Sequence, residues 1–310
     1  MDEMKSLLKK APRGGSLFWR ITLLTNPDVC NLHCALCFLH QRGRSYGKGE
    51  MPWEVAEKAV RTYAARGICE VIPSTMGEPL LYSHFGKLES LVQELGLKLN
   101  VTTNGSFPGK GALAWARELL PISADIKVSC WGTSKKNWDV LSPGMHLSTY
   151  LQNLKTLAEE RQRLAENSAD GLSKLSLQMA VCKTNRGDVE RAVELAAELG
   201  FDRIKLNRAV FLSHSQALKE LEELPPEDYL DRSAVESLPV KLEGTFLYPA
   251  TEASRQESCP FLGRELWILP DGSTEPCPDP ENRFQGLSQG KNRCEICHLF
   301  PKKFFSPDLN

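Results

Sequence analysis

Three cysteines lie close together near the start of the chain. Cys30, Cys34 and Cys37 form a C-x3-C-x2-C motif within the segment CNLHCALC. Three thiolates on one short loop can hold three irons of a [4Fe–4S] cube and leave the fourth iron open to an added ligand. A zinc site would need a fourth ligand, which His33 or His40 offers. The cluster is favoured, because the motif directly follows a predicted strand, where barrel active sites lie.

A second group of cysteines lies near the end of the chain. Cys259 and Cys277 are separated by the pattern C-x12-G-x4-C, and Cys294 and Cys297 form a C-x2-C pair. Four thiolates close the coordination shell of either an iron–sulfur cluster or a zinc ion. The spacing alone leaves both open.

Strand-like and helical segments alternate along the first two thirds of the chain. The strands are expected at 21–26, 69–74, 98–103, 125–129, 174–181 and 203–208, and the helices at 52–67, 85–96, 113–120, 148–165 and 189–200. Each crossover is long enough for a helix, so the strands should be parallel and the connections right-handed. These units predict an α/β fold, a partial (βα)6 TIM-like barrel over residues 1–212. A helical bridge (213–250) and a small cysteine-rich C-terminal domain (251–310) should follow, and a strand at 266–270 should enter a hairpin turn at Asp271–Gly272.

Composition narrows the class of protein. The 310 residues carry a net charge of −1, which gives no sign of a nucleic-acid partner or a membrane surface. No apolar run approaches the roughly 18 residues of a membrane span, and the charged N-terminus is not a secretory signal. A cytoplasmic protein is expected. In that reducing compartment metal binding is the leading explanation of ten cysteines.

The cysteine loop and three later motifs resemble the radical S-adenosylmethionine superfamily over most of the chain. Leu36 replaces the usual aromatic residue before the third cysteine, and Met76, Gly77, Glu78 and Pro79 resemble the GGEP motif. A TNG turn closes the third strand at Asn104, and Ser129 ends the fourth. The resemblance implies that residues 76–79, Asn104 and Ser129 contact S-adenosylmethionine, which binds the open iron through its amino and carboxylate groups. It also implies cleavage to a 5′-deoxyadenosyl radical and an external electron donor such as flavodoxin or ferredoxin.

The C-terminal cysteines resemble the auxiliary-cluster domain called SPASM or, when shortened, twitch. A full SPASM domain has seven cysteines and two clusters, whereas four cysteines remain here. The resemblance therefore implies a twitch domain in which Cys259, Cys277, Cys294 and Cys297 fully ligate a second [4Fe–4S] cluster. Such a cluster suits electron transfer more than substrate binding.

One further cysteine is placed for chemistry by strand alternation. On the fifth strand, Leu175, Leu177, Met179 and Val181 should face the helices, so that Gln178, Ala180 and Cys182 face the barrel interior. Cys182 lies at the carboxyl end of its strand, the level of barrel active sites. A thiol there can donate a hydrogen atom, although a lone cysteine is more often a small buried hydrophobe.

The short chain, the twitch pattern and the loop sequence CALCF resemble the radical sugar and aminoglycoside epimerases. The resemblance implies that the adenosyl radical removes hydrogen from a carbinol carbon and that Cys182 returns hydrogen to the opposite face. A small polyhydroxylated substrate is expected, and several inward polar residues weakly support it: Asn100, Asn104, Gln178, Lys205 and Asn207. Trp131, Trp138 and Trp267 are expected in packing more than in sugar stacking.

Three other functions remain open. A dehydrogenase resembling 2-deoxy-scyllo-inosamine dehydrogenase would pass an electron to the second cluster and need no thiol donor. A peptide maturase is a further alternative, although only about 20 residues precede the first strand. An iron–sulfur or zinc-stabilised binding protein would not cleave S-adenosylmethionine reductively.

Overall fold

The fold is built on one curved sheet whose strands follow the predicted order. The computed structural model describes residues 19–37, 39, 49–73, 76–167, 171–209, 230–231, 237–244, 247–248 and 264–275. The first six strands are β1 (Arg20–Leu23), β2 (Glu70–Pro73), β3 (Lys98–Thr103), β4 (Ser123–Cys130), β5 (Lys174–Val181) and β6 (Arg203–Arg208). They are neighbours in sequence order, and each pair is parallel. This confirms the α/β fold with a parallel sheet.

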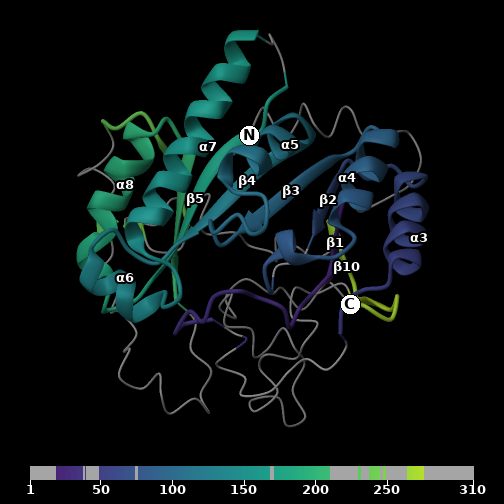
Figure 1. Cartoon of the computed structure of the whole chain (residues 1–310), viewed down its shortest axis with the longest axis horizontal. Coiled ribbons are helices and arrows are strands. Elements are labelled where there is room, and N and C mark those ends of the chain that lie inside the picture. Colours follow the sequence, from purple (N-terminus) through teal and green to yellow (C-terminus); the bar gives the residue numbers. More distant parts are fainter. Residues whose placement is uncertain are drawn as a thin grey trace, which may run out of the picture.

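Helices fill the crossovers, as parallel pairing requires. They are α3 (Trp53–Ala64), α4 (Phe85–Glu94), α5 (Ala112–Ile122), α6 (Lys135–Leu141), α7 (Leu147–Asn167) and α8 (Val189–Glu198). They lie along the outer side of the sheet, with α3 and α4 near β1 and β2 and with α6 and α8 near the other end (Figure 1). The short helix α6 was not predicted. No described helix has the length and apolar character that a membrane crossing requires.

Side chains alternate along β5 as predicted. Leu175, Leu177, Met179 and Val181 are buried in the main hydrophobic core with the helices. The intervening residues face the other way, because successive side chains of a strand point to opposite faces. The same alternation puts Cys130, at the end of β4, into the main core.

The predicted C-terminal hairpin forms, and it joins the barrel sheet. Strand β10 (Glu265–Ile268) turns back into β11 (Thr274–Glu275) through Gly272, whose φ of +83° favours glycine. Strand β10 also pairs in parallel with β1. The Glu265 carboxylate accepts hydrogen bonds from Arg20 Nε and Thr22 Oγ1, both at 2.6 Å. A strand from the segment expected to form a separate domain thus extends the barrel sheet.

The bridge also contributes a strand. Strand β8 (Lys241–Glu243) pairs in parallel with β6, where helical fragments were expected. A separate pair joins β7 (Leu230–Asp231) to β9 (Leu247–Tyr248). Cys259, Cys277, Cys294 and Cys297 lie outside the described residues, so the twitch domain and its cluster stay a prediction.

The carboxylate of Glu89, on α4, makes stability depend on pH. Its pKa is raised to about 7, chiefly by burial. The charge of Glu118 contributes to the rise, and the charge of Lys110 opposes it. Its Oε1 atom is buried and has no hydrogen-bond partner among the described residues. Since the folded pKa lies above the ordinary value of 4.5, this group's contribution to stability is lost as pH rises from about 4.5 to about 7.

Glu89→Gln is therefore expected to raise the free energy of unfolding at pH 8 by about 1 kcal/mol, allowing for solvent screening of a half-buried group. At pH 5 the gain should be less than half of this. Urea denaturation of both proteins at the two pH values measures the difference. An equal gain at both values would contradict the explanation.

Candidate active site

The cysteine motif forms a loop between β1 and α3, held at both of its ends. Val29 N donates to Asn26 O at 3.1 Å, and Cys37 N donates to Cys34 O at 3.0 Å. Ala35 N donates to the Leu141 carbonyl at the end of α6, also at 3.0 Å. The loop therefore crosses from β1 to the far side of the barrel, as the path of the chain shows (Figure 1).

The three thiols of the loop lie in polar or buried surroundings. Cys30 Sγ lies 3.4 Å from Leu32 N and 3.6 Å from Asn104 Nδ2, which donate to it. Cys34 is buried, with its Sγ 3.8 Å from Ser142 Oγ. The pKa of Cys34 is raised to about 12, chiefly by burial, with a smaller rise from Cys37 and Cys30 and an opposing contribution from the Ser142 contact.

This donor set fits an iron–sulfur cluster, because three soft thiolates from one loop suit iron and sulfide. Among the described residues, no group of three or more His, Cys, Asp or Glu side chains is gathered to hold a single metal ion. A cube does not require such a group, since each thiolate binds a different iron. His40, one of the two possible zinc ligands, lies outside the described residues.

The loop after β2 packs directly against the cysteine loop. Gly77 has a φ of +74°, and a Cβ added there would lie 2.2 Å from Asn26 O and 2.6 Å from Val29 O. Glu78 N donates to Val29 O at 2.8 Å, and Asn26 Nδ2 donates to Glu78 O at 2.6 Å. The two loops thus share one backbone interface that only glycine allows. Met76 is buried, and its side chain packs with Leu24, Trp267 and Leu269.

The Glu78 side chain joins this loop to the end of β3. Its buried carboxylate accepts hydrogen bonds from Thr103 Oγ1 at 2.8 Å, Asn104 N at 2.7 Å and Leu80 N at 3.3 Å. Burial raises the pKa of Glu78 to about 7, and these three donors oppose the shift. Sequence reasoning gave residues 76–79 a contact with S-adenosylmethionine and missed the part that the Glu78 side chain has in joining the two loops. The threonine before the TNG asparagine was the available signal.

Asn104 and Ser129 lie where the sequence placed them, at the carboxyl ends of β3 and β4. Asn104 Nδ2 contacts Cys30 Sγ and also donates to Asn31 Oδ1 at 2.9 Å, so this residue touches the cysteine loop. Ser129 pairs in register with Gln178 of β5, and its carbonyl accepts a hydrogen bond from Tyr150 Oη at 2.9 Å. Their contacts with a cofactor stay predictions.

Cys182 lies beside the cysteine loop, although the two are far apart in sequence. Its side chain is fully buried in a small apolar cluster with Leu36, Leu141 and Ala209, against which Ala35 and Trp131 pack. Cys182 N donates to Asn185 Oδ1 at 2.8 Å, which fixes the turn after β5. Burial raises the pKa of the Cys182 thiol, so it stays protonated at neutral pH. Cys69, by contrast, is exposed.

Fold and site together define an α/β-barrel enzyme with a three-thiolate loop at the carboxyl ends of its strands. The model of the Radical SAM superfamily matches residues 27–224, and the chain belongs to this family. Membership implies S-adenosylmethionine and a [4Fe–4S] cluster as cofactors.

Comparison with individual proteins gives one relative in sequence and several in fold. The chain is 38% identical over 80 residues to the S-adenosylmethionine-dependent nucleotide dehydratase of Lacinutrix mariniflava, covering 25% of this chain and only 17% of that one. Streptococcus suis SuiB bound to its precursor peptide SuiA superposes with a TM-score of 0.62 at 17% identity, over 99% of this chain and 69% of that one. Native anSMEcpe with bound AdoMet gives a TM-score of 0.61 at 16% identity, over 83% and 74%. These structures show a shared fold.

Proposed function

We propose that this radical SAM enzyme inverts a carbinol carbon of a small polyhydroxylated substrate, with Cys182 as the hydrogen-atom donor. One observation carries the proposal: the Cys182 thiol lies in the same buried cluster as Leu36, between the second and third cysteines of the loop. A thiol at the carboxyl end of a barrel strand, against the loop that holds the cluster, is placed to meet a radical formed there.

The bound cluster and S-adenosylmethionine supply the species that removes a hydrogen atom from the substrate carbon. Cys30, Cys34 and Cys37 would hold the cluster. Residues 76–79, Asn104 and Ser129 would hold S-adenosylmethionine, with Glu78 fixing the loop after β2 against β3.

Cys182 would complete the inversion. Its S–H bond breaks and a new C–H bond forms on the face opposite to the one that lost hydrogen. The sulfur radical then needs one electron and one proton to regain its hydrogen. The electron would come from an external donor such as flavodoxin or ferredoxin, through the second cluster of Cys259, Cys277, Cys294 and Cys297 in the proposed twitch domain.

The surroundings of Cys182 suit hydrogen-atom donation more than ionic chemistry. A thiolate has no hydrogen atom to give, and burial among apolar side chains keeps this thiol neutral. The same side chains keep water away, which would limit side reactions of a radical.

Cys182→Ala tests this role. The reconstituted variant should still form 5′-deoxyadenosine from S-adenosylmethionine with a panel of sugars and aminocyclitols, but the inverted product should fall to background. Cys130→Ala is the matched control, because this buried thiol ends the neighbouring strand and packs into the main core. An unchanged yield from Cys182→Ala, with an oxidised product from both proteins, would instead support the dehydrogenase.

A further inference from the structure

Charged side chains fill the inward face of the barrel below the proposed site. They come from six strands of the sheet: β1, β2, β4, β6, β8 and β10. The cations are Arg20, Lys127, Arg203 and Lys205, and the carboxylates are Glu70, Asp125, Glu243 and Glu265. Burial lowers the pKa of Lys127, and the positive charges of Lys205, Arg20 and Arg203 lower it further, while Asp125 opposes the shift.

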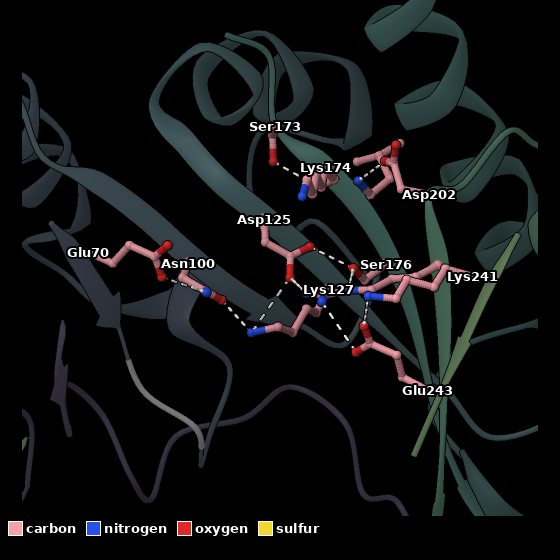
Figure 2. Close-up of polar contacts among 12 residues, drawn as sticks. Glu70, Asn100, Asp125, Lys127, Ser173, Lys174, Ser176, Asp202, Lys241 and Glu243 are labelled. Atoms are coloured by element: carbon pink, nitrogen blue, oxygen red, sulfur yellow. Dashed lines mark hydrogen bonds and ion pairs between the residues drawn. The ribbon is translucent and has the colours of Figure 1, made fainter. Parts of the chain in front are cut away.

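Three of these cations have partners among the described residues, and Figure 2 shows those of Lys127. Arg203 binds the Asp125 carboxylate and lies 3.4 Å from Glu243 Oε2. Arg20 Nε lies 2.6 Å from Glu265 Oε2. Lys127 donates to Asn100 Oδ1 and lies 3.9 Å from Asp125 Oδ2. Asn100 in turn donates to Glu70 at 3.0 Å, so the amide links a lysine to a carboxylate.

Lys205 differs from the other three. Within the part of the chain that the structure describes, its Nζ makes no hydrogen bond or ion pair. The nearest carboxylate in register, Glu243, is bound by Arg203 and by Lys241 at 2.9 Å. Burial lowers the pKa of Lys205, and the charge of Glu243 offsets this only in part. A partly buried cation that none of the described residues pairs is costly, and an arriving anion would reduce that cost.

The position of Lys205 connects it to the proposed active site. Its register partner is Gln178 on β5, which is itself paired with Ser129 on β4. Cys182 lies four residues beyond Gln178, or about 13 Å along the strand direction. A lysine side chain spans part of that distance, so a ligand held by Lys205 would extend along the strands toward Cys182.

We propose that Lys205, with Lys127 nearby, forms a subsite for an anionic group of the substrate, either a phosphate or a carboxylate. This rests on the proposed function, in which the substrate carbon lies near Cys182. The carbinol carbon and the anionic group would then lie at opposite ends of one ligand. All hydrogen-bonding groups that the two lysines present are donors, so the matching group must supply acceptors.

Binding of inorganic phosphate and of acetate to the holoenzyme tests the subsite without requiring turnover. Phosphate is expected to bind the native protein, and Lys205→Met should weaken it by about tenfold or more, the usual effect of losing a charge-assisted hydrogen bond. Lys205→Arg should retain most of the affinity. Lys155→Met, at an exposed position of α7, should retain all of it. If Lys205→Met does not fold, Lys205→Gln takes its place.

The two anions separate the possible ligand groups, because tighter binding of phosphate indicates a phosphorylated substrate and tighter binding of acetate a carboxylate. Equal affinity in the native protein and Lys205→Met would overturn the proposal. Displacement of phosphate by saturating S-adenosylmethionine would also overturn it, since Lys205 would then hold the cofactor's own carboxylate. None of these results depends on Cys182, so Cys182→Ala should bind phosphate like the native protein.

Discussion

Cys34→Ala is expected to reduce reductive cleavage of S-adenosylmethionine to background. Cys34 is the central cysteine of the motif, and its side chain is buried. If Cys30, Cys34 and Cys37 hold the cluster as proposed, the variant would leave one further iron without a protein ligand, and the cluster would be lost or inactive. The readout is 5′-deoxyadenosine formed under dithionite, together with the iron content of the anaerobically reconstituted protein.

Cys130→Ala separates loss of the cluster from loss of a buried thiol. Both residues are buried, but Cys130 packs into the main core and donates to the Gly132 carbonyl at 3.5 Å. The Cys130→Ala variant should keep the iron content of the native protein and cleave S-adenosylmethionine at the native rate. Cleavage by Cys34→Ala at the native rate would refute the assignment of the loop.

Gly77→Ala is expected to have the second largest effect on stability and cofactor binding, because both the backbone conformation and the surrounding atoms disfavour a side chain at this position. A left-handed backbone conformation costs alanine about 1–2 kcal/mol. The added Cβ would also lie 2.2 Å and 2.6 Å from the carbonyl oxygens of Asn26 and Val29, and backbone atoms cannot move aside without moving the cysteine loop. We therefore expect the free energy of unfolding to fall by several kcal/mol and the affinity for S-adenosylmethionine to fall by tenfold or more.

Gly96→Ala provides the matched control. Gly96 has a similar φ of +64°, but nothing lies within 4 Å of an added Cβ. This variant should lose only the stability that a left-handed backbone conformation costs alanine, and it should bind S-adenosylmethionine with the native affinity. Isothermal titration of both variants measures the difference, and equal affinities would show that contact between the two loops does not matter.

Much of the barrel could be predicted from the sequence because its signals are local. The strands at 98–103, 174–181 and 203–208 have the predicted bounds, since each is a short run between clear turn or helix signals. The alternation along β5 also predicted which side chains face the helices. Cys182 could be placed at the level of the cysteine loop for the same reason.

The remaining features depend on contacts between distant segments, which local patterns do not encode. Strand β8 has only three residues and forms by pairing with β6, while β10 joins β1 across more than 200 residues of chain. The hydrogen bonds from Thr103 and Asn104 to Glu78 connect two loops, as does the contact of Gly77 with Asn26. The lack of a partner for Lys205 among the described residues likewise depends on distant segments, because Arg203 binds the carboxylates of Asp125 and Glu243.

The central claim is that Cys182 returns a hydrogen atom to the substrate, and turnover in D₂O tests it most directly. The thiol exchanges its hydrogen with solvent, so its hydrogen atom becomes deuterium before it is transferred. Mass spectrometry of the product should show one deuterium, located at the inverted carbon, in the native protein and none in Cys182→Ala. An oxidised product without deuterium from the native protein would contradict the claim and indicate a dehydrogenase.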